Sequence, residues 1–313
     1  MRYRNLISNT PSVSEIGLGA WQLGANTGWS SVSETDAIKM VHASLDEGIN
    51  FFDTAPNYGL GTSEERLGKA LKNVDRESIV VNTKFGHTDF GTINYESDSI
   101  RDTLERSLKR LQMDYVDSII IHNPPMEYLD GTKNNHYEIL EKLKEEGKIK
   151  AYGASLDTYD EMKLLMDTTE SKVIEAFFNI LHQDSARAFD LAKKKEVGII
   201  VKIPLDSGWL TGKYDTSSTF DDIRSRWSKS DIKTRAKLIE KVKFILNSPF
   251  PLSQSAIAFC LAFDAVSTVI PGSTTINQLK SNIESSRNSI SPNIVEQLEE
   301  FYKNEVEPIK LPW

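Results

Sequence analysis

The chain has 313 residues, of which 39% are hydrophobic and 26% charged, enough to bury most of the apolar surface of a soluble protein. Its 45 acidic and 37 basic residues give a formal charge of −8, which argues against nucleic acid as a partner. The longest apolar run, at 256–263, is far short of the ~20 residues that span a bilayer, and the N-terminus lacks the apolar core of a signal peptide, so we expect a cytoplasmic protein without a membrane partner.

Short apolar segments rich in Val, Ile and Phe recur along the whole chain and are predicted strands. In chain order they are "SEIGLGAW" (14–21), "NFFDT" (50–54), "IVVNTKFG" (79–86), "SIIIHN" (118–123), "IKAYGAS" (149–155), "VIEAFFN" (173–179), "GIIVKIP" (198–204) and "STVIPG" (267–272).

Helical patterns separate these segments. Leucine and isoleucine recur at steps of three and four residues in 99–112, and the segment 137–148 ends at Gly147, a residue typical of helix ends. Thr62 and Glu65 have the spacing of a capping box, which predicts the start of another helix.

Strands that are apolar on both faces and alternate with helices indicate a parallel sheet covered by helices. Eight such units with no break in composition favour a closed (β/α)8 TIM barrel that forms a single domain, 1–313. An open doubly wound sheet is the main alternative, but neither 17–22 nor 59–64 completes the G-x-G-x-x-G motif expected there. Beyond the barrel we expect a long loop after strand 7, at 206–266, and an extra C-terminal helix at 292–303.

The residues at or just past the carboxyl ends of the predicted strands are mostly polar. They are Trp21, Asp53, Lys84, His122, Ser155, Asn179, Lys202, Gly272 and Ser273. In a closed barrel all these positions lie on one rim, the face that holds the active sites of such barrels. Capping alone does not require a ring that contains Asp, Lys and His, so the rim is the candidate site.

Asp53, Tyr58, Lys84 and His122 form a set suited to carbonyl chemistry, although each also has a purely structural explanation as a cap, packing residue, ion-pair partner or core histidine. A phenol has a pKa of about 10, which an adjacent ammonium lowers, and a carboxylate keeps a partly buried lysine charged. We therefore expect Asp53 to hold Lys84 charged and Lys84 to lower the pKa of Tyr58. Such a site suits a reaction in which a carbonyl oxygen takes a proton, as in hydride transfer from a nicotinamide.

Several motifs resemble the aldo-keto reductase family over nearly the full chain. They are "GINFFDTAPNYGLGTSEERLGKAL" (48–71), "VVNTKFG" (80–86), "IIIHNP" (119–124), "GKIKAYGAS" (147–155), "PLDSGWLTGKY" (204–214) and "PGSTTINQLKSNIE" (271–284). The resemblance implies a (β/α)8 barrel that binds NADPH in extended form without a Rossmann domain. It also implies a catalytic tetrad of Asp53, Tyr58, Lys84 and His122, with Tyr58 as proton donor and His122 orienting the carbonyl.

The resemblance also implies the coenzyme contacts. For the adenosine phosphate end these are Gly272, Ser273, Thr275, Gln278 and Asn282, and for the pyrophosphate Pro204, Leu205 and Ser207. Backbone amides at a helix start also suit a phosphate physically. Some relatives have an arginine where Gln278 stands, so NADH is the alternative coenzyme.

The resemblance also implies that Trp21 and Asp53 contact the coenzyme. Other positions at the nicotinamide depart from the family pattern. Where the family has a Ser-Asn pair and a Gln, this chain has Ser155, Leu156 and Glu175, and Lys202 replaces the stacking aromatic residue. A cation against the ring disfavours the oxidised coenzyme unless a carboxylate offsets it. Our hypothesis is that Glu175 and Lys202, on adjacent strands, pair at the nicotinamide and shift the relative affinity for its two redox forms.

The substrate pocket is expected beside Trp21, Tyr58 and His122, and the substrate is expected to be a small aldehyde, ketone or sugar-like carbonyl. Further tryptophans are candidates either for its apolar walls or for plain packing; they are Trp29, Trp209 and Trp227.

Two other functions remain open. Lys84 could be the Schiff-base nucleophile of a barrel lyase, because imine chemistry also needs a lysine on the catalytic face. The chain could instead be a cofactor-binding regulatory subunit that senses redox state, as in some members of the family it resembles. No metal site is expected, since the five histidines show neither H-x-H nor H-E-x-x-H spacing. The sequence leaves the physiological substrate, the favoured direction and the oligomeric state open.

Overall fold

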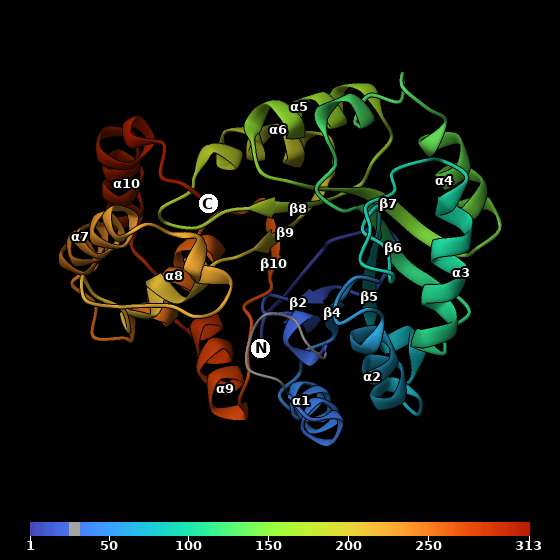
Figure 1. The fold of residues 1–313 in the computed structure, drawn as a ribbon, viewed down its shortest axis with the longest axis horizontal. Coiled ribbons are helices and arrows are strands. Elements are labelled where there is room, and N and C mark those ends of the chain that lie inside the picture. Colours follow the sequence, from blue (N-terminus) through green and yellow to red (C-terminus); the bar gives the residue numbers. More distant parts are fainter. Residues whose placement is uncertain (25–31) are drawn as a thin grey trace.

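The computed structural model describes residues 1–24 and 32–313, and eight parallel strands form one sheet in chain order (Figure 1). The strands are β3 (Leu18–Gly19), β4 (Phe51–Asp53), β5 (Val80–Phe85), β6 (Val116–Ile121), β7 (Ile149–Leu156), β8 (Val173–Phe177), β9 (Gly198–Lys202) and β10 (Val266–Val269). Just before β3, Gly17 N donates to Val269 O of β10 at 2.9 Å, and Ile16 and Val269 form a parallel bridge. The first and last strands are thereby joined, and the prediction of a closed (β/α)8 barrel is confirmed.

Helices alternate with these strands along the chain and cover the outside of the sheet (Figure 1). They are α1 (Glu34–Asp46), α2 (Thr62–Leu71), α3 (Ser99–Leu111), α4 (His136–Glu145), α5 (Tyr159–Thr168), α6 (Phe189–Lys194), α8 (Leu252–Leu261) and α9 (Ile276–Glu284). Among the described residues no helix combines the length and the apolar character needed to cross a membrane.

Two segments extend the barrel where the sequence predicts them. The connection from β9 to β10 contains the short turns η5 (Asp206–Thr211) and η6 (Ile223–Arg226) and the helix α7 (Lys229–Leu246) before α8. The extra C-terminal helix is α10 (Pro292–Phe301), which packs beside α7 and continues into a π turn, Tyr302–Val306 (Figure 1).

The barrel interior changes from apolar to polar along the strands. Near the amino ends, Phe51, Val80, Val173 and Ile200 share a buried cluster with residues of the N-terminal hairpin, β1 (Tyr3–Arg4) and β2 (Val13–Ser14), and the loop between its strands. Side chains repeat on one face of a strand every two residues, so the next inward positions are polar. These positions are Asp53, Asn82 and Glu175, with Lys202 one layer further along the barrel, and all four side chains are buried. Buried polar groups must be paired, and this layer is therefore where the site is built.

The predicted capping box of α2 is wrong. Gly61, at φ 90°, precedes the helix as its N-cap, so Thr62 is already the first helical residue and cannot cap it. The Thr62 hydroxyl instead donates to Gly59 O at 2.5 Å. Glycine adopts this left-handed backbone conformation without the steric cost of a Cβ atom. The conformation turns the chain from the rim into the helix.

Candidate active site

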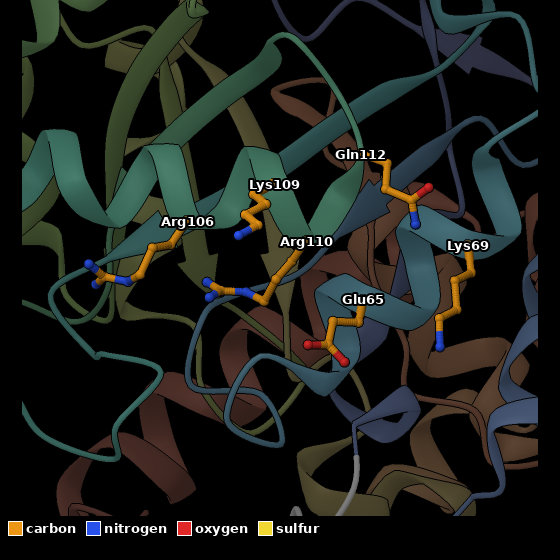
Figure 2. Close-up of a pocket in the computed structure, with 6 residues that line it drawn as sticks. All are labelled: Glu65, Lys69, Arg106, Lys109, Arg110 and Gln112. Atoms are coloured by element: carbon orange, nitrogen blue, oxygen red, sulfur yellow. The ribbon is translucent and has the colours of Figure 1, made fainter.

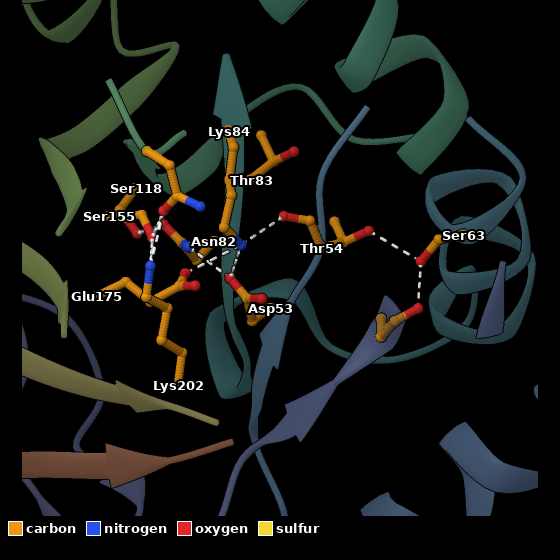
Figure 3. A network of polar contacts seen from close by, with 12 residues as sticks. Asp53, Thr54, Ser63, Asn82, Thr83, Lys84, Ser118, Ser155, Glu175 and Lys202 are labelled. Atoms are coloured by element: carbon orange, nitrogen blue, oxygen red, sulfur yellow. Dashed lines mark hydrogen bonds and ion pairs between the residues drawn. The ribbon is translucent and has the colours of Figure 1, made fainter. Parts of the chain in front are cut away.

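Lys84 lies at the centre of the buried polar layer and is fully enclosed (Figure 3). Its Nζ lies 2.6 Å from Asp53 Oδ1 and donates to Thr54 O at 3.1 Å. Asp53 ends β4 and Lys84 comes from the neighbouring β5. The two side chains that the sequence assigns to one rim are therefore in direct contact.

Asn82 and Ser118 support this pair, and the sequence analysis did not identify either. Asn82 is opposite Asp53 in the β4–β5 register and donates from Nδ2 to Asp53 Oδ1 at 2.7 Å. Ser118, opposite Asn82 on β6, donates to Asn82 Oδ1 at 2.6 Å. The alternation of inward positions along β5, from Asn82 to Lys84, is the signal that could have identified Asn82.

Glu175 does not pair with Lys202 as our hypothesis held. Its Oε2 lies 3.0 Å from Lys84 Nζ, so one ammonium is held between two carboxylates (Figure 3). The β8–β9 register explains the difference, because Lys202 is opposite Phe177, two residues beyond Glu175 toward the carboxyl ends. Lys202 therefore belongs to the next layer of the barrel.

Lys202 forms a second polar network in that layer. Its Nζ donates to Asn123 Oδ1 at 2.7 Å and to Ser155 Oγ at 2.9 Å, and it lies 2.8 Å from Asp157 Oδ1. Ser155 Oγ in turn donates to Asn123 Oδ1 at 2.8 Å. Asn123 and Asp157 were also missed by the sequence analysis, because each follows a strand end by one or two residues and has no motif of its own. Leu156 is buried in the layer between sheet and helices.

Tyr58 and His122 lie beside Lys84. The Lys84 ammonium is 5.2 Å from the centre of the Tyr58 ring, and the His122 ring meets that ring edge-on with centroids 5.8 Å apart. The Trp21 ring lies 6.4 Å from Tyr58, and His87 stacks on His122 at 4.4 Å. The four tetrad positions thus surround one point, although they come from separate segments of the chain.

The protonation states follow from burial and charge. Burial alone would lower the pKa of Lys84, but the Asp53 and Glu175 carboxylates outweigh it and raise that pKa. Burial and the Glu175 charge raise the pKa of Asp53 to about 7, although Lys84 acts in the opposite direction. For His122, burial and the Lys84 charge hold the pKa well below its ordinary value, so its imidazole is neutral at physiological pH.

Tyr58 departs from the expected tuning. Lys84 does act to lower the pKa of Tyr58, but burial of the hydroxyl is the larger effect and the pKa is raised. The carboxylates of Asp53 and Glu175 act in the same direction as burial. Tyr58 is therefore protonated at neutral pH, and its phenolate is costly.

The residues predicted for the adenosine phosphate end gather at the start of α9. Asn282 Nδ2 donates to Ser273 Oγ at 3.0 Å, and Thr275 caps the helix by accepting from Gln278 N at 3.2 Å. At Gly272 an added Cβ would lie 2.1 Å from Gln22 Nε2, so a larger residue would require the Gln22 side chain to move. The unpaired amides of the first helical turn fit a phosphate, and this turn contains no basic side chain.

The loop after β9, which contains Pro204, Leu205 and Ser207, has an unusual backbone conformation at two positions. Asp206 and Ser207 have φ of 47° and 51°, a left-handed region that is uncommon for residues other than glycine. Asp206 is buried and lies 2.8 Å from the Arg235 guanidinium of α7. This ion pair anchors the loop. Its partners are 29 positions apart in the sequence, so no local pattern could have predicted it.

The tryptophans divide between packing and rim. Trp209 is fully buried and lies 6.2 Å from the Trp227 ring, so both belong to packing under the β9 loop rather than to a pocket wall. Trp29 lies outside the described residues. Trp313, which the sequence analysis did not consider, lies with its ring 4.8 Å from Phe177 at the end of β8.

A cavity of about 410 Å³ lies outside the barrel, on α2, α3 and the residue after α3 (Figure 2). Its lining residues are Glu65, Lys69, Arg106, Lys109, Arg110 and Gln112, none of which is a predicted site residue. Within the part of the chain that the structure describes, no three His, Cys, Asp or Glu side chains are grouped as a metal site would require.

Comparisons with known proteins identify one family. The model of the Aldo/keto reductase family matches residues 15–303. L-Galactose dehydrogenase of Arabidopsis thaliana is 31% identical over 283 residues, 87% of this chain and 83% of that protein. NADH-specific methylglyoxal reductase of Escherichia coli is 29% identical, covering 87% and 89% of the two chains. A solved aldo-keto reductase of Bacillus halodurans in its holo form superposes with a TM-score of 0.80 at 26% identity and 96% coverage of both chains.

Proposed function

This chain belongs to the aldo/keto reductase family of oxidoreductases, which use a nicotinamide coenzyme, and from that premise we propose that it reduces an aldehyde or ketone to an alcohol. Its coenzyme is NADPH, with NADH as the alternative, and its substrates are small carbonyl compounds that include sugar-like ones. One observation carries this proposal: a buried ammonium, Lys84, lies 2.6 Å from Asp53 and 5.2 Å from the ring of Tyr58. We further propose that residues 1–313 act as a single barrel domain.

Tyr58 acts as the proton donor in this proposal. When bound, the reduced nicotinamide supplies a hydride to the carbonyl carbon. Because its pKa is raised, Tyr58 is protonated at the start and can donate its proton to the carbonyl oxygen as negative charge develops there. Lys84 then stabilises the phenolate that remains, and Asp53 holds Lys84 in place. Neutral His122 hydrogen-bonds the carbonyl oxygen without competing for the proton.

The coenzyme is bound along the rest of the rim. The amides at the start of α9, with Ser273, Thr275 and Asn282, would hold the adenosine phosphate end, and the β9 loop would contact the pyrophosphate. Gln278 is a neutral side chain whose Oε1 accepts from Thr274 N at 2.8 Å. A neutral residue gives NADPH less advantage over NADH than an arginine would.

The lyase alternative requires a neutral amine at Lys84, because only the free base attacks a carbonyl. Contact with two carboxylates raises the pKa of Lys84 and opposes that state. The regulatory alternative is consistent with the same side chains and differs in outcome, since it predicts coenzyme binding with slow turnover on every carbonyl.

Coenzyme titration followed by a substrate screen tests the proposal. NADPH and NADH are titrated by fluorescence, and aldehydes, ketones and sugars are then screened by loss of nicotinamide absorbance. We expect binding of at least one coenzyme and turnover of at least one carbonyl, with no adduct trapped by borohydride. Failure to bind either coenzyme would contradict the proposal, whereas tight binding with slow turnover throughout would favour the regulatory alternative.

A further inference from the structure

Glu175 adds a second carboxylate to the catalytic centre. Its side chain is 3% exposed, and its Oε2 lies 3.0 Å from Lys84 Nζ. Asp53 Oδ1 is 2.6 Å from the same nitrogen. Lys84 is the one cation that the described residues bring into contact with both carboxylates, so the three groups together have one negative charge in excess when all are ionised.

No other charged group among the described rim residues cancels this excess. The titratable groups around the ion pair, taken from every strand that faces it, are Asp53, Tyr58, Lys84, His87, His122 and Lys202. His122 is neutral, because burial and nearby cations lower its pKa. Lys202 lies one layer further along the barrel, where Asp157 is 2.8 Å from its ammonium. Above the pKa of Asp53, which is about 7, the negative charge therefore remains close to Tyr58, among buried side chains where charges act strongly.

We propose that Glu175 sets the direction in which the site works, favouring reduction of a carbonyl over oxidation of an alcohol. This inference rests on the proposed function. In the reduction, the carbonyl carbon gains a hydride and its oxygen gains the Tyr58 proton, while the coenzyme ring is oxidised and becomes a cation. An excess of negative charge nearby stabilises that cation relative to the neutral reduced ring.

The same charge acts on Tyr58. Alcohol oxidation starts from the Tyr58 phenolate, which must take the alcohol proton, and Glu175 opposes the formation of this second anion. Reduction starts from the protonated phenol, which is fully populated at neutral pH, and solvent restores its proton after each turnover. A neutral amide at position 175 would remove both effects and leave the Asp53–Lys84 contact intact.

The test is Glu175→Gln, which keeps the shape of the side chain and removes its charge. Dissociation constants of the oxidised and reduced forms of whichever coenzyme binds are measured for wild type and variant. We expect the ratio of oxidised to reduced constants to rise by about tenfold or more. We also expect the pH midpoint of alcohol oxidation to fall by about one unit. Glu170→Gln makes the same chemical change at an exposed position before β8 and should alter neither quantity.

Glu175→Met, which is also uncharged and of similar length, repeats the test with an apolar side chain. Equal changes in both dissociation constants, with an unmoved pH midpoint, would overturn the proposal. Loss of reduced-coenzyme binding by both variants would also overturn it, because Glu175 would then be needed for the fold of the site rather than for its charge. Wild type that binds neither coenzyme marks instead the failure of the proposed function, and it is visible before any variant is made.

Discussion

Replacing Lys84 by methionine removes the cation from the buried layer and leaves its partners in place. Methionine retains much of the lysine stem, so the packing of the fully enclosed side chain changes little. Asp53 and Glu175, which lie 2.6 Å and 3.0 Å from the ammonium, then face each other without a cation. Removing one partner of a buried ion pair costs about 3–5 kcal/mol. We expect the variant to lose that much unfolding free energy at pH 7.

The loss should grow with pH. Burial and the Glu175 charge already raise the pKa of Asp53 to about 7 with Lys84 present, so without Lys84 we expect Asp53 to stay protonated above pH 7. A pKa raised by folding gives stability that is complete below the unfolded value, of about 4, and is lost as pH rises to the folded value. In the wild type this contribution to the unfolding free energy is lost by about pH 7. In the variant the unfolding free energy continues to fall above pH 7, by about 1.4 kcal/mol per pH unit.

Urea unfolding of both proteins at pH 5, 7 and 8.5 measures this difference. Lys69→Met is the control, because its ammonium pairs with the half-exposed Glu34 at 2.9 Å and such surface pairs contribute little to stability. We expect no pH trend in the control. A destabilisation of Lys84→Met that is the same at all three pH values would refute the reasoning, since it would mean that Asp53 does not depend on Lys84 for its charge.

Three further predictions concern coenzyme, substrate and pH. Gln278→Arg adds a cation at the start of α9 and should lower the dissociation constant of NADPH about tenfold while leaving that of NADH nearly unchanged. Equal changes in both constants would show that this helix does not bind the 2′-phosphate of NADPH. Trp313→Ala removes the ring that lies against Phe177, and we expect the substitution to raise the KM of bulky aromatic carbonyls more than the KM of small aldehydes. An equal increase for both would make Trp313 a packing residue only. Because the pKa of His122 is held well below its ordinary value, no titration step of carbonyl reduction near pH 6.5 should depend on His122, and any step near pH 7 belongs to Asp53; a step that disappears in His122→Gln would contradict the neutral imidazole.

The barrel could be predicted because its signals are local. Each apolar segment of four to eight residues is bounded by turns. The two-residue period of a strand is then sufficient to assign the polar residue at its end to the rim. Asp53 and Lys84 were brought to the same face by this reasoning, and the structure places them in contact. Where an outcome depended on a single backbone conformation the prediction was wrong, as at Thr62, where the left-handed Gly61 displaced the expected cap.

Pairing across strands could not be predicted, because it depends on register. Glu175 and Lys202 are on adjacent strands, yet the strand register sets them two residues apart, in different layers of the barrel. Glu175 therefore pairs with Lys84 instead. The Asp206–Arg235 pair joins a rim loop to α7, and only the folded chain brings the two together. The same holds for the pKa of Tyr58, whose direction is set by how deeply the hydroxyl is buried rather than by its neighbours in the sequence.

Turnover by Tyr58→Phe decides whether this phenol is the proton donor of the reaction. The variant keeps the ring that faces Lys84 and His122 and loses only the hydroxyl, so coenzyme affinity should stay within about twofold while reduction of the best carbonyl falls by about 100-fold or more. Reduction at close to the wild-type rate would show that the proton comes from elsewhere, and loss of coenzyme binding would contradict a role of the hydroxyl confined to proton donation.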